Sequence, residues 1–404
     1  MSDLEVALKR WLIRALFAAV GLSLMALTAL GAAWWTATPD IGARAEGERL
    51  ARMTASPQWD GDAFGNKLPQ VDGSIGGNLR KALSGGDAVQ VPEAELPVVA
   101  RSGAEFAALP DSGLRVTWLG HSTLLVEIDG VRVLVDPVWG ERASPWSSAG
   151  PARFYAPPLP LDELPEIDAI IISHDHYDHL DYPTVSALRD ARVRWLVPLG
   201  IGAHLEHWGV PAERVTELDW WEAVTIESLT LTATPARHFS GRWLDRFSST
   251  LWVGWALRGP EHAVFYSGDT ALNPELADIG ERLGPFDMTM MDSGAYDSLW
   301  TDVHMGPEQT VIAHQMVRGD VLLPVHWGLF DLGNHGWTEP MERSLAAAKR
   351  QGVRIVTPRP GASVELADAD RIDRWWPELP WVDVEADPVW SSSVDELIEQ
   401  WWKP

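Results

Sequence analysis

The chain has 404 residues, and its 32 basic and 57 acidic side chains give a formal net charge of −25. A surface of this charge repels phosphate backbones, which excludes a general nucleic-acid binder. Hydrophobic residues make up 46% and charged residues 22%, so the composition is that of a globular chain. Cysteine is absent, which excludes disulfides, thiol nucleophiles and thiolate metal sites, and leaves histidine and carboxylate as metal ligands.

The N-terminal segment predicts a membrane anchor. Lys9, Arg10 and Arg14 precede an uncharged stretch over 15–35 that closes with two tryptophans. Its 21 residues reach the roughly 20 that a helix needs to cross a bilayer. The preceding positive charges keep residues 1–14 in the cytoplasm and place the remaining chain outside, as in a single-pass membrane protein. Cleavage as a signal peptide, which would give a secreted or periplasmic protein, is the alternative.

Three segments follow the anchor. Residues 36–110 are rich in Gly, Pro, Asp and Ala and indicate a linker and lead-in. Residues 111–365 alternate β-rich runs with helical patterns, which predicts one catalytic domain of the α/β class. Residues 366–404 carry six tryptophans, which indicate a strap packed on the domain, with a lipid-facing aromatic patch as the alternative. These tryptophans are Trp375, Trp376, Trp381, Trp390, Trp401 and Trp402.

Within the catalytic domain the expected elements come in a regular order. Strands are expected at 115–120, 123–129, 131–136, 169–172, 194–197, 229–233, 250–256, 263–266, 288–291 and 321–325. Asp129-Gly130 between the second and third of them predicts a hairpin turn. Helices are expected near 183–190, 201–208, 307–318 and 340–351. The pattern favours sheets covered by helices.

A cluster of histidines and aspartates follows the expected strand at 169–172. His174 and His176 are two residues apart, so in an extended backbone both imidazoles point to one side and can bind one cation. Asp178 and His179 come next, where a turn into a helix can direct them at a second cation. Imidazole and carboxylate are the ligands that zinc takes where thiolates are lacking. The motif therefore predicts a metal centre.

A site for two metals needs further ligands from other strand ends, and three residues fit. His238 follows the run 229–233, and Asp269 follows the run 263–266. His326 stands at the end of the run 321–325. Their positions at strand ends make them the expected remaining ligands.

The chain from Val116 to about Glu339 resembles metallo-β-lactamase-fold hydrolases and, within them, the N-acyl-phosphatidylethanolamine phospholipase D branch. The matching motifs are WLGHST, LVDPVW, SHDHYDHLD, ELDWWE, GDT, GPFD, GAY and VHWG. The resemblance implies an αββα sandwich with the metals at one edge. It also implies two Zn²⁺ ions, whose ligands are His174, His176 and His238 for one, Asp178, His179 and His326 for the other, and Asp269 as a bridge.

The chemistry expected of such a centre is hydrolysis by a metal-bridging hydroxide, which two zinc ions generate at neutral pH. Asp178 can orient this hydroxide. His304 matches a family position beside the site, where we expect it to contact phosphate or protonate the leaving group, although a helix-terminal residue without a catalytic part is the alternative. His121 and Asp136 match the family at strand ends, where they are expected to hydrogen-bond to the ligand imidazoles.

The chain departs from the animal enzymes around Gly294. Those enzymes carry Ile-Pro-Ile before this glycine and Glu-Pro-Arg-Trp after the tyrosine that follows. Here Met-Asp-Ser precedes Gly294, and Asp297 begins the stretch after Tyr296, so an arginine is missing and an acid is added. The sequence predicts a dinuclear zinc phosphodiesterase of phospholipase D type, acting on a phospholipid-like or small-molecule substrate. Hydrolysis of lactones or other esters is the alternative, and a non-catalytic metal-binding scaffold is a third interpretation.

Overall fold

Two seven-stranded sheets lie at the centre of the molecule. In spatial order the first sheet contains β16 (Ser363–Glu365), β3 (Leu114–Gly120), β4 (Thr123–Ile128), β5 (Val131–Val135), β6 (Ala169–Ile171), β7 (Arg194–Pro198) and β8 (Val215–Leu218). The second contains β15 (Arg354–Ile355), β14 (Gly319–Val325), β13 (Phe286–Asp292), β12 (Ala263–Tyr266), β11 (Gly254–Arg258), β10 (Leu229–Thr234) and β9 (Ala223–Ile226). Buried side chains of both sheets share one core, so the sheets pack against each other.

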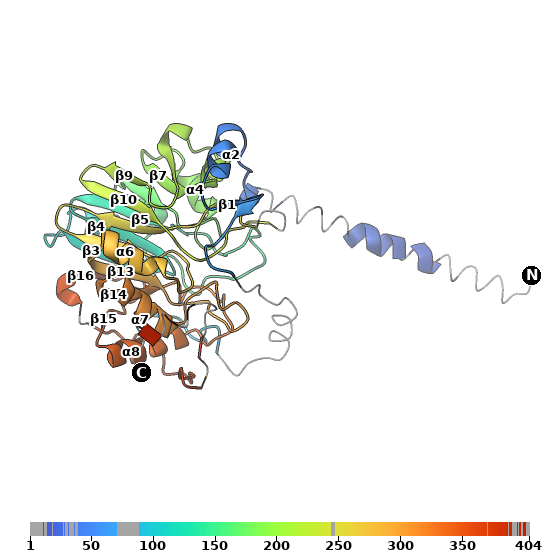
Figure 1. Ribbon diagram of the computed structural model, residues 1–404. Coiled ribbons are helices and arrows are strands. Elements are labelled where there is room, and N and C mark those ends of the chain that lie inside the picture. The colour runs from blue at the N-terminus through green and yellow to red at the C-terminus, as the bar shows by residue number, and fades with distance from the viewer. Residues whose placement is uncertain are drawn as a thin grey trace, which may run out of the picture.

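The computed structural model describes residues 11, 14–17, 19–26, 28, 31, 36, 39–70, 89–243, 247–369, 371–386, 388–389, 394, 396 and 399–400. Helices α4 (Tyr182–Leu188) and α5 (Ile201–His207) contribute to a separate core on the outer side of the first sheet. Helix α7 (Pro307–Met316) contacts β13 and β14 of the second sheet, and helices α6 (Glu275–Leu283) and α8 (Glu339–Gln351) pack against α7. Figure 1 shows α4 beside β7, and α7 and α8 at the opposite end of the domain near β14 and β15. The layers confirm the αββα sandwich that the sequence predicts.

Smaller elements complete the described chain. They are α2 (Gly47–Thr54), the two-stranded sheet of β1 (Trp59–Asp60) and β2 (Ala63–Phe64), and the 3₁₀ turns at Gly103–Phe106, Leu161–Glu163, Ala212–Arg214 and Leu366–Asp368. Helix α2 is tied to the catalytic domain through Arg49, whose guanidinium lies 2.7 Å from Glu217 and 2.5 Å from Glu206. The lead-in segment therefore contacts the first sheet and α5.

Local sequence signals explain the elements that hold the site. Asp129 and Gly130 both have positive φ angles, 48° and 90°, as the tight turn between β4 and β5 requires. Helix α4 begins after Asp181, whose side chain accepts a hydrogen bond from the Thr184 N–H. The SHDHYDH motif lies in the connection between β6 and α4. Strand β6 pairs in parallel with β5 on one side and with β7 on the other, and its side chains are buried.

The expected strand at 250–256 is partly wrong, because β11 begins only at Gly254. The residues before it cross toward the first sheet: the Leu251 N–H donates to the Leu199 carbonyl and the Val253 N–H to the Ser173 carbonyl, at 2.9 Å each. The strands β8 and β9 and the helix α6 were absent from the sequence prediction. Each of these two strands is four residues long and buries one side chain, Leu218 or Ile226, so its strand pattern is short and weak in the sequence.

The predicted membrane anchor over 15–35 is contradicted. Residues 18, 27, 29, 30 and 32–35 of this stretch lie outside the described part of the chain, and its longest described helical run is 19–26. In the residues that the structure describes, no helix combines the length and apolar character needed to cross a bilayer. The prediction of an N-terminal transmembrane helix and of a single-pass membrane location is therefore wrong, because an uncharged stretch spans a bilayer only as one long helix.

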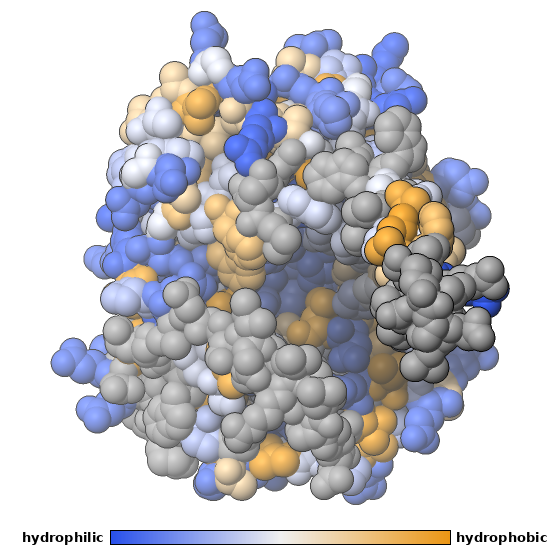
Figure 2. Space-filling model, turned by 90° about the vertical axis from the view of Figure 1, so that its right-hand side faces the viewer, coloured by the Kyte–Doolittle hydropathy of each residue, from blue (hydrophilic) through white to orange (hydrophobic). Residues whose placement is uncertain are grey.

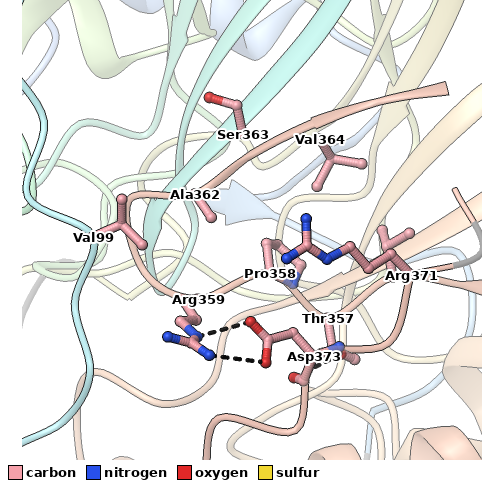
Figure 3. A pocket seen from close by; sticks show the side chains of 10 residues that line it. Val99, Thr357, Pro358, Arg359, Ala362, Ser363, Val364, Arg371 and Asp373 are labelled. Atoms are coloured by element: carbon pink, nitrogen blue, oxygen red, sulfur yellow. Dashed lines mark hydrogen bonds and ion pairs between the residues drawn. The ribbon is translucent and has the colours of Figure 1, made fainter. Parts of the chain in front are cut away.

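The described part of the C-terminal segment packs on the domain. The Trp375 ring lies 5.1 Å from that of Trp327 and 6.2 Å from that of Trp118, between ring centres. A cavity of about 230 Å³ lies beside this segment, where Arg359 makes a two-point ion pair with Asp373 (Figure 3). Trp390, Trp401 and Trp402 lie outside the described residues. The segment boundaries at 36–110 and 366–404 stay a prediction.

Candidate metal centre

The seven predicted ligands meet at one edge of the sandwich. The connection after β6 supplies four of them from the first sheet, and the loops after β10, β12 and β14 supply three from the second. All seven are buried except His176, which is partly exposed. They are His174, His176, Asp178, His179, His238, Asp269 and His326.

Asp269 lies at the centre of this group. Its Oδ2 atom is 3.0 Å from Nε2 of His326 and 3.1 Å from Nε2 of His179. The same oxygen is 3.5 Å from Nε2 of His174 and 3.7 Å from Nε2 of His238. One carboxylate thus faces imidazoles from both halves of the fold, which is the position that a bridging ligand requires.

Two adjacent groups of potential ligand atoms contain the seven predicted residues. Within each set the atoms lie within 4.8 Å of one another. The first set contains His174, His176, His238 and Asp269, and the second contains His121, Asp178, His179 and His326. The division matches the sequence prediction, apart from the addition of His121 to the second set.

Unpartnered polar atoms at the centre of the site test whether these residues fit a metal ion. Among the described residues, Nε2 of His179 and Oδ1 of Asp269 are buried without a hydrogen-bond partner. Buried polar atoms of this kind are costly unless something else satisfies them. Imidazole nitrogens and carboxylate oxygens, with no sulfur, form a donor set that suits Zn²⁺ or a similar divalent cation. The residues therefore fit a metal centre.

Electrostatics favour the metal-binding forms of His174, His238 and Asp269. Burial lowers the pKa of His174 and of His238 well below the usual value, so both imidazoles are neutral. Burial would raise the pKa of Asp269, but the surrounding imidazoles, His179 first, hold it well below its usual range. Burial would lower the pKa of His179, yet Asp269 and Asp178 raise it well above the ordinary value. The carboxylates of Asp269 and Asp178 therefore stabilise positive charge at the centre of the site.

Further hydrogen bonds orient the predicted ligands; Asp136 contacts an imidazole as expected, whereas His121 contacts the Asp178 carboxylate and not an imidazole. Asp136 Oδ2 lies 2.7 Å from Nδ1 of His179. His121 Nε2 lies 2.8 Å from Asp178 Oδ2, and His238 Nδ1 lies 2.8 Å from the Val303 carbonyl oxygen. Such partners fix ring orientation and tautomer at metal sites.

The backbone at the site is strained at several positions. His121, Asp136, Ala295 and His326 have positive φ angles of 52°, 37°, 54° and 67°. None of them is glycine, so each conformation costs free energy that the surrounding structure must offset. Strain of this kind gathers at functional sites, where loops must place side chains against their preference.

His304 lies beside the two ligand sets, in the loop before α7. Its Nδ1 atom is 3.0 Å from Asp292 Oδ2 and 4.0 Å from Asp269 Oδ2. Its ring stacks on that of His326, with centres 4.9 Å apart and planes 24° apart. Asp292 itself was missed as a site residue, although an acid at the carboxyl end of a buried strand run could have indicated it.

A pocket of about 420 Å³ opens over the metal centre. Its base contains His176, Asp178, Asp269, His304 and His326, and its walls contain Phe239, Phe247, Ala295, Trp300, Val303 and Leu332. The sequence analysis did not identify these wall residues, which come from separate loops. Figure 2, which faces the side where long loops leave the sheets in Figure 1, shows a hollow with hydrophilic residues inside and hydrophobic residues along its edges.

Comparison with known proteins agrees with this geometry. The family described as a beta-lactamase superfamily domain matches residues 131–327. An uncharacterised protein of Mycobacterium tuberculosis is 50% identical over 269 residues, which is 66% of this chain and 72% of that protein. N-acyl-phosphatidylethanolamine-hydrolyzing phospholipase D 1 of Caenorhabditis elegans is 37% identical over 267 residues, covering 63% of this chain and 74% of the relative. A metal-dependent hydrolase of Methanopyrus kandleri is 30% identical over 261 residues and is covered completely.

A solved structure supports the fold alone. The isothiocyanate hydrolase from Delia radicum gut bacteria matches 62% of this chain and 98% of its own, with 21% identity and a TM-score of 0.50. Relatives of 30% identity or more, covered over more than two thirds of their length, carry the family assignment. The chain therefore belongs to the metallo-β-lactamase superfamily, as a metal-dependent hydrolase whose relatives include N-acyl-phosphatidylethanolamine-hydrolysing phospholipase D.

Proposed function

We propose that this chain is a dinuclear zinc hydrolase that cleaves phosphodiesters carrying an apolar group, as a phospholipase D does. The observation that carries the proposal is the pair of ligand sets joined by Asp269 at the base of an apolar-walled pocket. One ion would be held by His174, His176 and His238, the other by Asp178, His179 and His326, with Asp269 shared. The identity to the phospholipase D of Caenorhabditis elegans supports the reaction class.

Two zinc ions, when bound, supply Lewis-acid chemistry that activates water near neutral pH and neutralises charge on a phosphoryl oxygen. The side chains of the protein would position the water and the substrate. Asp178 lines the pocket and is held from behind by the imidazole of His121, so its carboxylate can orient the attacking water. His304 lines the pocket on the other side of Asp269, where it can contact the phosphoryl group or protonate the leaving oxygen.

The walls of the pocket support a substrate with an apolar part. Phe239, Trp300 and Leu332 face the space above the ligands, and Phe247 stands at its mouth with 60% of its surface exposed. An acyl or alkyl chain that covered these rings would remove apolar surface from water. A phosphodiester of the phospholipid type combines such a chain with a single negative charge at the metal centre.

The same walls suit a neutral ester or lactone, which is the second candidate. Among the described residues that line the pocket there is no lysine or arginine to select a phosphate. A carbonyl carbon is as open to attack by activated water as a phosphorus atom, so the reaction differs only in the bond that breaks. Comparison of substrates therefore has to separate the two.

The deciding experiment measures zinc content and hydrolysis with the full-length protein. Bis-p-nitrophenyl phosphate, N-acyl phosphatidylethanolamine and a lactone serve as substrates, and Asp269→Ala is the inactive control. The proposal expects two zinc ions per chain and turnover of both phosphodiesters, with Phe247→Ser raising KM for the lipid but not for the nitrophenyl diester. Turnover of the lactone alone would favour the ester hydrolase. Two zinc ions without turnover of any substrate would favour a non-catalytic scaffold.

A further inference from the structure

Asp292 is a buried carboxylate behind the metal centre. It is the last residue of β13 and lies in register with Val325 of β14, directly beside His326. None of its surface is exposed. Its Oδ2 atom is 3.0 Å from Nδ1 of His304, and its Oδ1 atom is 3.5 Å from Nδ1 of His326. One carboxylate therefore stands behind two imidazoles of the site.

The backbone holds this carboxylate in place. The Thr270 N–H donates to Oδ2 at 3.2 Å, and the Gly294 N–H donates to Oδ1 at 3.3 Å. The main chain of Asp292 is fixed as well, because its N–H donates to the Ser267 hydroxyl and its carbonyl accepts from the Thr310 hydroxyl. With both ends of the side chain and the backbone bonded, the carboxylate has a defined direction.

This direction determines which nitrogen of His304 carries a proton. A carboxylate only accepts hydrogen bonds, so Nδ1 of His304 must be the donor. Asp292 thus occupies the Nδ1 side of the ring, and Nε2 has no hydrogen-bond partner among the described residues. Since the ring of His304 lines the pocket, Nε2 is the nitrogen that remains for the substrate.

We propose that Asp292 is a positioning residue that holds the Nδ1–H of His304 and so directs Nε2 of this ring toward the pocket. The inference deepens the proposed function, because it assigns the group that prepares His304 for its part in the reaction. Asp136 has a similar place in the first sheet, because its Oδ2 atom is hydrogen-bonded to Nδ1 of His179. Each sheet thus contributes one buried carboxylate behind the imidazoles.

A different role for Asp292 would be direct coordination. Its carboxylate lies within 4.8 Å of ligand atoms of Asp269, His304 and His326, so the four could in principle surround a cation. The hydrogen bonds from Thr270 and Gly294 argue against this role, because they already occupy lone pairs on both oxygens. Metal content separates the two roles.

The first test needs no change to Asp292. The zinc-loaded full-length protein is labelled with ¹⁵N-histidine, and the His304 signals are assigned by their loss in His304→Gln. We expect a proton on Nδ1, hydrogen-bonded to Asp292. A proton on Nε2 alone would overturn the proposal. This readout does not depend on turnover, so it stands even if the proposed function fails.

The second test combines Asp292→Asn, His304→Ala and the double variant, with Asp287→Asn as the matched control. Asp287 lies on the same strand and accepts a hydrogen bond from the Ala263 N–H, away from the site. We expect Asp292→Asn to keep the zinc content of the wild type while kcat/KM for bis-p-nitrophenyl phosphate falls 10- to 100-fold, on the order found for residues behind metal ligands. The double variant should be no slower than His304→Ala. Loss of a zinc ion in Asp292→Asn, or multiplied effects in the double variant, would contradict the proposal.

Discussion

Oδ2 of Asp136 lies 2.7 Å from Nδ1 of His179, and both side chains are fully buried. Asp136 also accepts hydrogen bonds from the Ser173 N–H and hydroxyl and from the Tyr266 hydroxyl. It therefore connects the ring of His179 to the start of the SHDHYDH motif. Four hydrogen-bonding groups meet at one carboxylate, so its loss would disturb the direction of His179 toward the metal centre.

Replacing this carboxylate should weaken metal binding. For Asp136→Asn we expect about a 10- to 100-fold loss of zinc affinity, because the partner that orients His179 becomes a poorer acceptor. Competition with a chelator of known affinity measures the change. A variant with unchanged affinity but lower stability would show that Asp136 serves the fold rather than the metal.

Asp269 is expected to be required for occupation of both metal positions. In Asp269→Asn the shape remains, but the negative charge that faces four imidazoles is lost. Zinc content should fall from two ions to one or fewer per chain, and hydrolysis should fall about 100-fold or more. Elemental analysis of the dialysed protein checks the first result. Retention of two ions would exclude the bridging role.

The buried pair of Arg343 and Glu308 should dominate the stability of the second helical layer. The Arg343 guanidinium donates to both Glu308 oxygens, at 2.9 Å and 2.8 Å, and none of its surface is exposed. Arg343→Met leaves a buried carboxylate without its partner, which should lower the free energy of unfolding by about 3–5 kcal/mol. Adding Glu308→Leu should recover part of this loss. Urea unfolding measures both, and a double variant weaker than the single one would contradict the account.

His314 should make stability depend on pH. It is buried and bonded to the Thr289 hydroxyl, and burial lowers its pKa to about 4. Between about pH 6.5 and pH 4 the unfolded chain therefore binds a proton that the folded chain does not, so stability falls as the pH falls. From pH 7 to pH 5 the loss should be about 2 kcal/mol.

Urea unfolding at these two pH values checks the His314 prediction. His314→Gln should show a smaller loss than the wild type, because it lacks the group that titrates. The exposed His207 offers a matched control, and His207→Gln should keep the loss of the wild type. Equal losses in His314→Gln and the wild type would show that other groups cause the dependence.

Most residues of the candidate site could be predicted from their spacing and from their positions at the ends of buried strands. His174 and His176 alternate in an extended backbone, and His238, Asp269 and His326 end buried strands, so the carboxyl ends of the sheets bring them together. The structure brings these residues together in two groups, with His121 added to the second, and their role as metal ligands stays a prediction. Short-range spacing and strand ends are visible in one sequence.

The remaining features depend on contacts that spacing does not encode. The pocket walls come from separate loops around Phe239, Trp300 and Leu332, and the role of Asp292 depends on its register beside His326. The strand expected from 250 begins at Gly254 because backbone bonds to the first sheet compete for the preceding residues. The predicted anchor over 15–35 rested on a count of uncharged residues, and no helix in the described part of the chain combines the length and apolar character needed to cross a bilayer.

The ligands of the metal centre come from both sheets, with His174 on one side and His326 on the other. Cations bound between them would link segments about 150 residues apart in the chain, at the edge where the two sheets meet. A chain without cysteine has no covalent link of this kind. Because folding alone brings these residues together, coordination would stabilise the folded state, and a chelator would remove that stabilisation. Catalysis and the closure of the sandwich would then depend on the same ions.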